Sequence, residues 1–217
     1  MPVLTDPRPV PKRKRLPKTA EPAWDLDRLF PGQGQWTDAE YLRLVRMTEA
    51  ERLVEMVDGR IEVLPAPTLA HQLINGYLYR LLFEFVAAGS LGLVVFSGMR
   101  VRVRERSFRM PDVVFIGKRS RRRVSQEFWE GADLAMEVVS EDDPSRDYVK
   151  KRSEYAAAGI KEYWIVDPRD RSITVLVLKG KKYQERGRYL DGQLAPSAIL
   201  PGFVAAAVTG TFDAAKD

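Results

Sequence analysis

The chain has 217 residues, of which 45% are apolar and 30% charged, a balance typical of a globular protein rather than a disordered one. It contains no cysteine and one histidine, His71, which excludes disulfides, thiolate metal sites, cysteine nucleophiles and metal sites built on several imidazoles. No apolar run approaches the roughly 18 residues of a membrane span. The basic N-terminus also lacks the apolar segment of a secretory signal, so we expect a cytoplasmic protein without membrane contact.

The first 20 residues carry the whole net charge of +5. They hold six basic residues against Asp6, together with five prolines, whereas residues 21–217 hold 29 basic and 29 acidic side chains. Such a segment has little to bury, so we predict a disordered basic, proline-rich arm over residues 1–22 and a single domain over residues 23–217. The run Pro11-Lys-Arg-Lys-Arg15 either contacts phosphates, serves as a nuclear address in a nucleated host, or is simply solvated.

The first half of the domain combines two helices with short strands. The capping box Thr37-Asp-Ala-Glu40 predicts a helix, and Asp58-Gly59 between two β-prone runs predicts a hairpin over residues 54–64. A second helix is indicated from His71 to about Ala88, where apolar residues repeat on one stripe before Gly89. Four strands then follow, of which the last two are nearly continuous apolar runs typical of central strands: Leu93–Phe96, Met99–Arg104, Asp112–Ile116 and Leu134–Val139.

The second half begins with a helix from Asp143-Pro144 to about Ala158, because a carboxylate cap and a first-turn proline favour a helix start. Glu162–Asp167 is predicted as a buried strand, residues 173–178 and 182–189 as a hairpin, and Asp191-Gly192 as a turn. This order predicts an α/β domain around one mixed sheet.

Two carboxylates interrupt the apolar pattern of the central strands. Glu137 lies inside the otherwise apolar run Leu134–Val139, where an unpaired charge costs several kcal/mol. Asp112 opens the neighbouring apolar strand. Two carboxylates at adjacent strand ends suit a hard divalent cation, whereas the alternative is that Glu137 pairs with an arginine and Asp112 caps a turn.

Lys151 is the third member of this group. Helical spacing places Tyr148, Lys151 and Tyr155 on one face, which we expect to pack on the sheet, while Lys150 faces water. An inward lysine needs a partner, and the pocket that contains Glu137 is the obvious one because this helix follows that strand. The alternative is a lysine whose amine reaches back to solvent.

These residues resemble the PD-(D/E)XK nuclease pattern, and over roughly residues 37–180 the chain is most similar to the Uma-type family described as putative restriction endonucleases. The similar segments are Val57-Asp-Gly-Arg-Ile61, Pro65-Ala-Pro67, His71-Gln72, Arg109-Met-Pro-Asp-Val113, Asp133-Leu-Ala-Met-Glu-Val-Val-Ser140, Arg146-Asp-Tyr-Val-Lys-Lys151 and the stretch from Tyr155 to Pro168. One departure is that Val139 stands where the parent motif has lysine. In the Uma-type branch the lysine is displaced to the following helix, at the position of Lys151.

The resemblance implies a restriction-endonuclease-like mixed sheet flanked by helices, with an added N-terminal helix and hairpin and a C-terminal hairpin. It also implies metal-dependent hydrolysis of phosphodiester bonds in DNA. Asp112 and Glu137 would hold Mg²⁺ or Mn²⁺ together with the Val138 carbonyl and waters. Lys151 would orient the attacking water or stabilise developing charge on the phosphate.

Three further residues are candidates for the active site, and each has two possible interpretations. Glu55 either faces the acidic pocket or lies on the wet face of its strand. His71 either serves as an acid behind the metal ligands or contacts a phosphate, or it is a satisfied histidine at the start of its helix. Asp147 lies four residues before Lys151 and positions it, or takes part directly.

Several arginines supply charge for phosphate contact, although a solvated face is the default interpretation of such runs. They are Arg100, Arg102, Arg109, Arg121, Arg122 and Arg123. Cutting two strands needs two sites, which is compatible with a homodimer. The competing function is a catalytically weak nucleic-acid-binding or assembly module that keeps the nuclease fold, and the neutral charge of residues 21–217 favours it.

Overall fold

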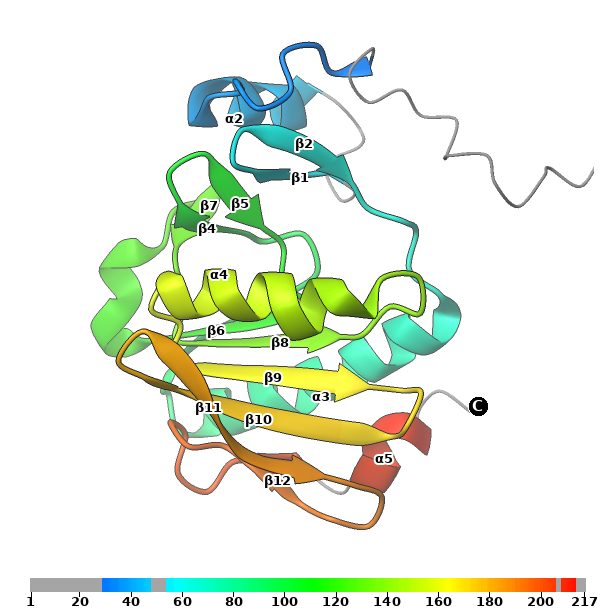
Figure 1. Ribbon diagram of the computed structural model, residues 1–217. Coiled ribbons are helices and arrows are strands. Elements are labelled where there is room, and N and C mark those ends of the chain that lie inside the picture. Colours follow the sequence, from blue (N-terminus) through cyan, green and yellow to red (C-terminus); the bar gives the residue numbers. More distant parts are fainter. Residues whose placement is uncertain (1–28, 48–53, 206–207, 214–217) are drawn as a thin grey trace, which may run out of the picture.

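The computed structural model describes residues 29–47, 54–205 and 208–213, which form a mixed α/β structure with two main sheets (Figure 1). The predicted basic arm over residues 1–22 lies outside the described residues and stays a prediction. Among the described residues, no helix is both long and apolar enough to cross a membrane.

The larger sheet has six strands in the order β11-β10-β9-β8-β6-β3. β8 and β9 are parallel, and the other neighbours are antiparallel. The strands are β3 Gly92–Phe96, β6 Val113–Gly117, β8 Leu134–Val138, β9 Glu162–Asp167, β10 Ser172–Lys179 and β11 Lys182–Tyr189. The central apolar runs and the C-terminal hairpin are therefore strands, as predicted.

Both faces of this sheet are covered, which explains why its central strands are apolar at successive positions. Side chains alternate between the faces, so Val113 and Met136 pack in one core while Val114 and Ala135 pack in the other. The helix α3 (Leu69–Ala88) lies on the first face through Ile74, Leu78, Leu82 and Val86. The other face is covered by the helix α4 (Arg152–Ala157) through Tyr155 and Ala156.

The helical segment before α4 is wound more widely than an α-helix. It is a π-helix, η2 (Arg146–Lys151), which continues directly into α4. The sequence predicts one α-helix over this whole region, so the position of the helix is confirmed and its winding is not. Short π-helical turns inside helices occur frequently at functional sites.

A second, five-stranded sheet corrects the expectation of one mixed sheet. Its order is β2-β1-β5-β4-β7, with β1 Val54–Val57, β2 Arg60–Val63, β4 Arg100–Arg104, β5 Ser107–Arg109 and β7 Phe128–Glu130. β5 and β7 are not predicted, because three-residue strands are too short to show an alternating pattern. The predicted hairpin is confirmed, and both Asp58 (φ 51°) and Gly59 (φ 69°) adopt the left-handed backbone that its turn requires.

The helix α2 (Asp38–Met47) packs on this second sheet. Its capping box forms as predicted, because the Thr37 backbone N–H donates to Glu40 over 2.9 Å and the Glu40 N–H donates to the Thr37 hydroxyl over 3.3 Å. The buried Tyr41 hydroxyl donates to the Val54 carbonyl over 2.8 Å, which fixes the helix against β1.

Smaller elements complete the described chain. The 3₁₀-helix η1 (Lys118–Arg123) follows β6, and the short strands β12 (Ala195–Pro196) and β13 (Val204–Ala205) pair with each other. The last element is the helix α5 (Val208–Asp213). Ala195, Leu200, Phe203 and Phe212 join the core on the α3 face, so this C-terminal segment closes the sheet on that side.

Two glycines give matched tests of this packing. A Cβ at Gly76, in the middle of α3, would meet nothing within 4 Å, so Gly76→Ala should raise the free energy of unfolding by about 0.5–1 kcal/mol. A Cβ at Gly92 would meet the backbone of β6, including the Gly117 Cα at 2.8 Å. Gly92→Ala should therefore lower the stability, and urea denaturation measures both effects. Equal midpoints for the two variants would show that β3 does not approach β6 this closely.

Candidate active site

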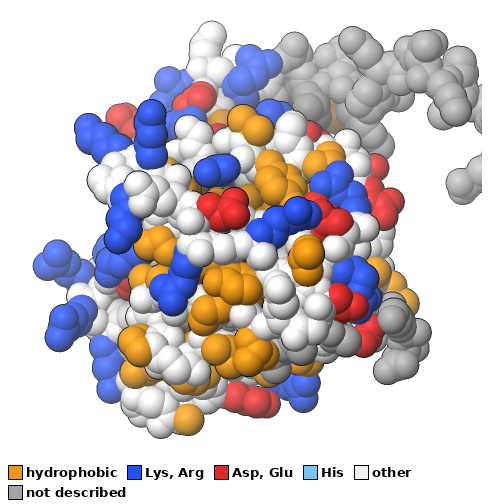
Figure 2. All heavy atoms as spheres, turned by 60° about the horizontal axis from the view of Figure 1, so that its bottom comes forward, with side chains coloured by type: hydrophobic (Ala, Val, Ile, Leu, Met, Phe, Trp, Pro, Cys, Tyr) orange, Lys and Arg blue, Asp and Glu red, His pale blue; other side chains and the backbone are white. Residues whose placement is uncertain are grey.

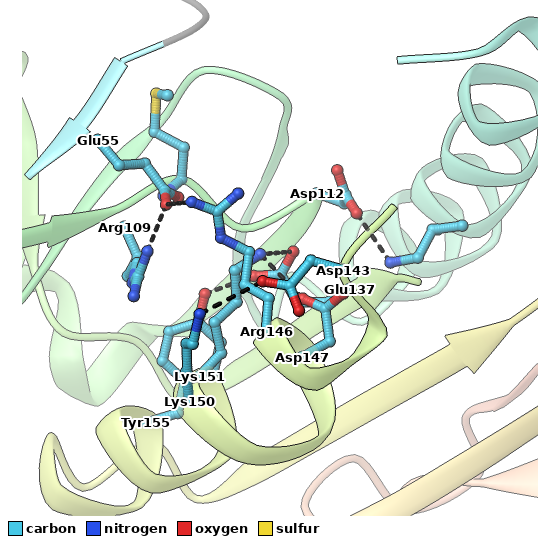
Figure 3. Close-up of polar contacts among 12 residues, drawn as sticks. Glu55, Arg109, Asp112, Glu137, Asp143, Arg146, Asp147, Lys150, Lys151 and Tyr155 are labelled. Carbon is cyan, nitrogen blue, oxygen red and sulfur yellow. Dashed lines mark hydrogen bonds and ion pairs between the residues drawn. The ribbon is translucent and has the colours of Figure 1, made fainter. Parts of the chain in front are cut away.

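Asp112 and Glu137 lie together at one end of the six-stranded sheet (Figure 3). Asp112 immediately precedes β6, and Glu137 is near the end of the antiparallel neighbour β8. The Val138 backbone N–H donates to the Asp112 carboxylate over 2.8 Å, which fixes Asp112 beside that strand end. Both residues line a pocket of about 440 Å³, whose walls come from α3, the segment 64–68, residues 138–142 and η2.

Glu137 is 2% exposed, and both of its oxygens have partners. The Tyr155 hydroxyl donates to Oε1, and the Lys151 Nζ lies 2.8 Å from Oε2. Burial raises the pKa of Glu137 to about 8, and the nearby carboxylates of Asp112 and Asp147 add to this effect against the opposing charge of Lys151.

Lys151 enters the pocket from η2, as the sequence predicts. Its side chain is 9% exposed and lies 3.1 Å from Asp147 as well as close to Glu137. Burial disfavours the charged amine, but these two carboxylates outweigh burial and hold the pKa of Lys151 above its usual value. Lys150, in contrast, is 57% exposed and lies 3.3 Å from Asp143. The structure therefore distinguishes the two adjacent lysines clearly.

Tyr148 packs against the same core as Tyr155, as the spacing predicts. It is only partly buried, and its hydroxyl donates to Asp167 at the end of β9 over 2.9 Å. The wider winding of η2 changes the phase of the side chains relative to an α-helix, and it also brings Asp147 inward.

His71 joins the site through Asp112. Its Nε2 lies 3.2 Å from the Asp112 carboxylate, and its backbone N–H donates to the Thr68 hydroxyl that caps α3. Although burial opposes the charged imidazole, the hydrogen bond and charge of Asp112 raise the pKa of His71. His71 therefore lies in the first turn of α3 with its side chain on Asp112, and its role in the chemistry stays a prediction.

Glu55 does not lie on a wet strand face, and it does not line the pocket. It is fully buried behind the pocket, where it accepts from Arg109 Nη1 and from the Met110 backbone N–H, both over 2.7 Å. Met110 precedes the Pro111-Asp112 segment, so Glu55 anchors the chain that carries Asp112.

Arg109 is the centre of a buried ion-pair network, which corrects its assignment to nucleic-acid binding. It is 1% exposed and pairs with Glu55, with Glu62 at 2.9 Å, and in a two-point contact with Glu154 on α4. A guanidinium without access to solvent cannot reach a phosphate. The network instead joins the five-stranded sheet to the helix that continues from Lys151.

The other predicted arginines do not line the pocket. Arg102 is partly buried and pairs with Asp38 at 2.6 Å and Glu130 at 3.2 Å, and Arg100 is also partly buried on β4. Arg121, Arg122 and Arg123 belong to η1, which follows β6, whereas Asp112 precedes that strand. These three residues therefore lie at the opposite end of the sheet from the pocket.

Sequence reasoning misses several residues of the site. Tyr155 is predicted to face inward but not to donate to Glu137, and no local pattern indicates that Glu62, Arg146 and Glu154 share one network. Arg146, which lines the pocket, stands at the start of the segment 146–151 that resembles the family, and that resemblance is the signal in the sequence that indicates it.

The donor set fits a hard divalent cation with few protein ligands. The carboxylates of Asp112 and Glu137 open onto one cavity, and oxygen ligands are those that Mg²⁺ prefers. Within the described ranges, no group of three or more His, Cys, Asp or Glu side chains is arranged to hold a metal. A bound cation would therefore complete its coordination with backbone carbonyl and water, which Mg²⁺ usually retains.

Comparison with known proteins supports the predicted family. The family model "Uma2: Putative restriction endonuclease" matches residues 38–209. A crystal structure of a putative nuclease belonging to DUF820, from Anabaena variabilis ATCC 29413, covers 82% of this chain and 98% of its own, with a TM-score of 0.68 and 18% identity. At that identity the likeness shows the fold alone, and it confirms the restriction-endonuclease-like class. No curated protein matches the chain.

The network around Arg109 predicts a large effect on stability. Arg109→Met would leave the buried Glu55 with only the more distant Arg146, 3.9 Å away, so the free energy of unfolding should fall by about 3–5 kcal/mol. Arg104→Met is the matched control, because Arg104 is 38% exposed and its partner Asp58 is 66% exposed. Its loss should change stability by less than about 1 kcal/mol. Urea denaturation gives both values, and equal midpoints would contradict a structural role for the buried network.

Proposed function

The chain belongs to the Uma2 "Putative restriction endonuclease" family, and on that premise we propose that it is a metal-dependent nuclease that hydrolyses phosphodiester bonds of DNA. The observation that carries this proposal is the buried pair of Glu137 and Lys151 on the wall of the pocket that Asp112 also lines. Burying the carboxylates of Glu137 and Asp147 together with the Lys151 amine costs free energy, and a hydrophobic core does not need these groups.

In this proposal Asp112 and Glu137 hold Mg²⁺ or Mn²⁺, with the Val138 carbonyl as the backbone ligand. When bound, the cation would polarise the phosphodiester and increase the acidity of an attacking water. His71 supports Asp112 through its Nε2, and the Val138 N–H holds the same carboxylate from the other strand. These contacts keep the Asp112 side chain oriented before substrate enters.

Lys151 contributes the positive charge at the reacting phosphate. Glu137 and Asp147 keep its amine protonated and hold Nζ at the pocket wall. A protonated amine in that place orients the attacking water or stabilises negative charge that develops on the phosphate oxygens. Hydrolysis joins the water oxygen to phosphorus and breaks the bond to the leaving oxygen, which then takes up a proton.

The competing proposal is a catalytically weak nucleic-acid-binding or assembly module with the same fold. The contacts of Glu137 favour this alternative. Lys151 and Tyr155 already contact both of its carboxylate oxygens, which are the atoms that a metal ion would have to bind. The two proposals differ in what they require of Lys151, since a module that only binds needs the lysine as a structural counter-ion and not as a catalytic group.

Comparison of Lys151→Ala with Lys150→Ala separates the two proposals. If Lys151 acts on the reacting phosphate, its removal should lower the single-turnover rate of DNA cleavage by about 10²–10³-fold. Lys150→Ala should leave that rate unchanged, because Lys150 is exposed and pairs with Asp143 outside the pocket. Thermal melts of both variants report on folding. Equal cleavage rates would show that Lys151 is not catalytic, and absence of cleavage by the wild type with Mg²⁺ or Mn²⁺ would favour the binding module.

Metal binding should depend on pH through Glu137. Because burial raises its pKa to about 8, protons compete with the cation below that pH, so Mn²⁺ affinity should rise from pH 6 and level off above pH 8. Titration calorimetry measures this dependence. Asp112→Asn and Glu137→Gln should each abolish binding and leave the fold intact. Undiminished affinity in both variants would contradict the proposed site.

A further inference from the structure

The neutral charge of residues 21–217 conceals a separation of charge along the six-stranded sheet. The strand register shows which strand ends lie together. Phe115 pairs with Leu134, Leu134 with Glu162, and Glu162 with Val177. One end of the sheet therefore contains the end of β6, the starts of β8 and β9, the end of β10 and the start of β11. The pocket lies at the other end, where β6 begins and β8 finishes.

Basic residues gather at the end of the sheet away from the pocket. We call this surface the basic end, and define it by η1, the residue before β9, and the β10–β11 turn: Lys118, Arg119, Arg121, Arg122, Arg123, Lys161, Lys179, Lys181 and Lys182. Figure 1 shows η1, after β6, and the β10–β11 turn on the same side of the molecule, and Figure 2 shows Lys and Arg side chains projecting on that side.

Most of these charges have no carboxylate partner within the part of the chain that the structure describes. Arg123 and Lys161 share the buried Asp133, at 2.9 Å each. Among the described residues, none of the other seven lies within ion-pair distance of an acidic side chain, and all seven are exposed. Like charges crowded on one surface repel one another, so this arrangement creates a positive field that attracts polyanions.

The opposite end shows the contrast. There Arg169 pairs with Asp167 at 2.6 Å, Arg171 with Asp191 at 3.2 Å, and Arg188 with Asp170. The pocket rim adds Glu141 and Asp142, both exposed. Basic residues near the pocket end are therefore neutralised locally, whereas those of the basic end are not.

We propose that the basic end is a docking surface for the phosphate backbone of nucleic acid, separate from the pocket. This proposal rests on the proposed function only in naming nucleic acid as the polyanion. Binding to the basic end itself requires neither the metal nor Asp112. Lys118 and Asp112 are separated by the length of β6, about 20 Å at a rise of about 3.3 Å per residue. Contact with both regions therefore requires about six base pairs of duplex at about 3.4 Å each.

The test measures binding in EDTA, so that its outcome does not depend on cleavage. The probe is a fluorescein-labelled DNA duplex of about 20 base pairs, titrated by anisotropy between about 50 and 200 mM salt. The first variant is Arg119→Ser/Arg121→Ser/Arg122→Ser, and the second is Lys179→Ser/Lys181→Ser/Lys182→Ser, from the other side of the surface. The control Arg43→Ser/Arg80→Ser/Arg186→Ser removes the same charge from exposed residues elsewhere.

Each basic-end variant should weaken duplex binding by about tenfold or more and reduce the log–log salt slope by about 2–3, since each lost phosphate contact contributes about 0.9. The control should change the slope much less. Equal losses in all three variants would overturn the proposal, because only net charge would then matter. Unchanged DNA binding in both basic-end variants would overturn it as well. Binding to phosphatidylserine vesicles is measured in parallel, and variants that lose vesicle binding but keep DNA binding would also overturn the proposal.

Discussion

The buried carboxylate of Glu137 is the constraint on which the site depends. It lies in a strand covered on both faces and is only 2% exposed, so most of its partners must come from other elements of the protein. Lys151 and Tyr155 supply them from the helical segment that packs on that face, and the π-helical winding of η2 brings Asp147 inward beside them. The position of this helix relative to the sheet is thus coupled to the charge of one side chain.

A second buried network connects the five-stranded sheet to the helix α4, which packs on the six-stranded sheet. Arg109 contacts Glu55 on β1 and Glu154 on α4, and Glu55 in turn accepts from the backbone just before Asp112. The strand that carries one predicted metal ligand and the helix that carries the predicted catalytic lysine are therefore tied through the same guanidinium. Such a network stabilises one geometry, because removal of Arg109 would leave the buried Glu55 without its closest cation.

The distribution of charge separates chemistry from docking. Several carboxylates line the pocket, where a cation is expected, and exposed basic side chains, most of them without an acidic partner among the described residues, occupy the far end of the same sheet. Arg109 and Arg102, which the sequence suggests as phosphate contacts, are used for internal ion pairs instead. A basic residue in a sequence thus carries no information about its partner until the strands around it are placed.

The sequence by itself determined the elements whose signals are local: the capping box at Thr37, the Asp58-Gly59 turn, the apolar central strands, and an inward Lys151 opposite an anomalous Glu137. It did not determine the second sheet, because β5 and β7 are three residues long and their stability comes from neighbours far along the chain. The tertiary structure alone decided the roles of Glu55 and Arg109 and the separation of the basic end from the pocket. These depend on which strand ends meet, and strand pairing joins residues more than 50 positions apart in the chain.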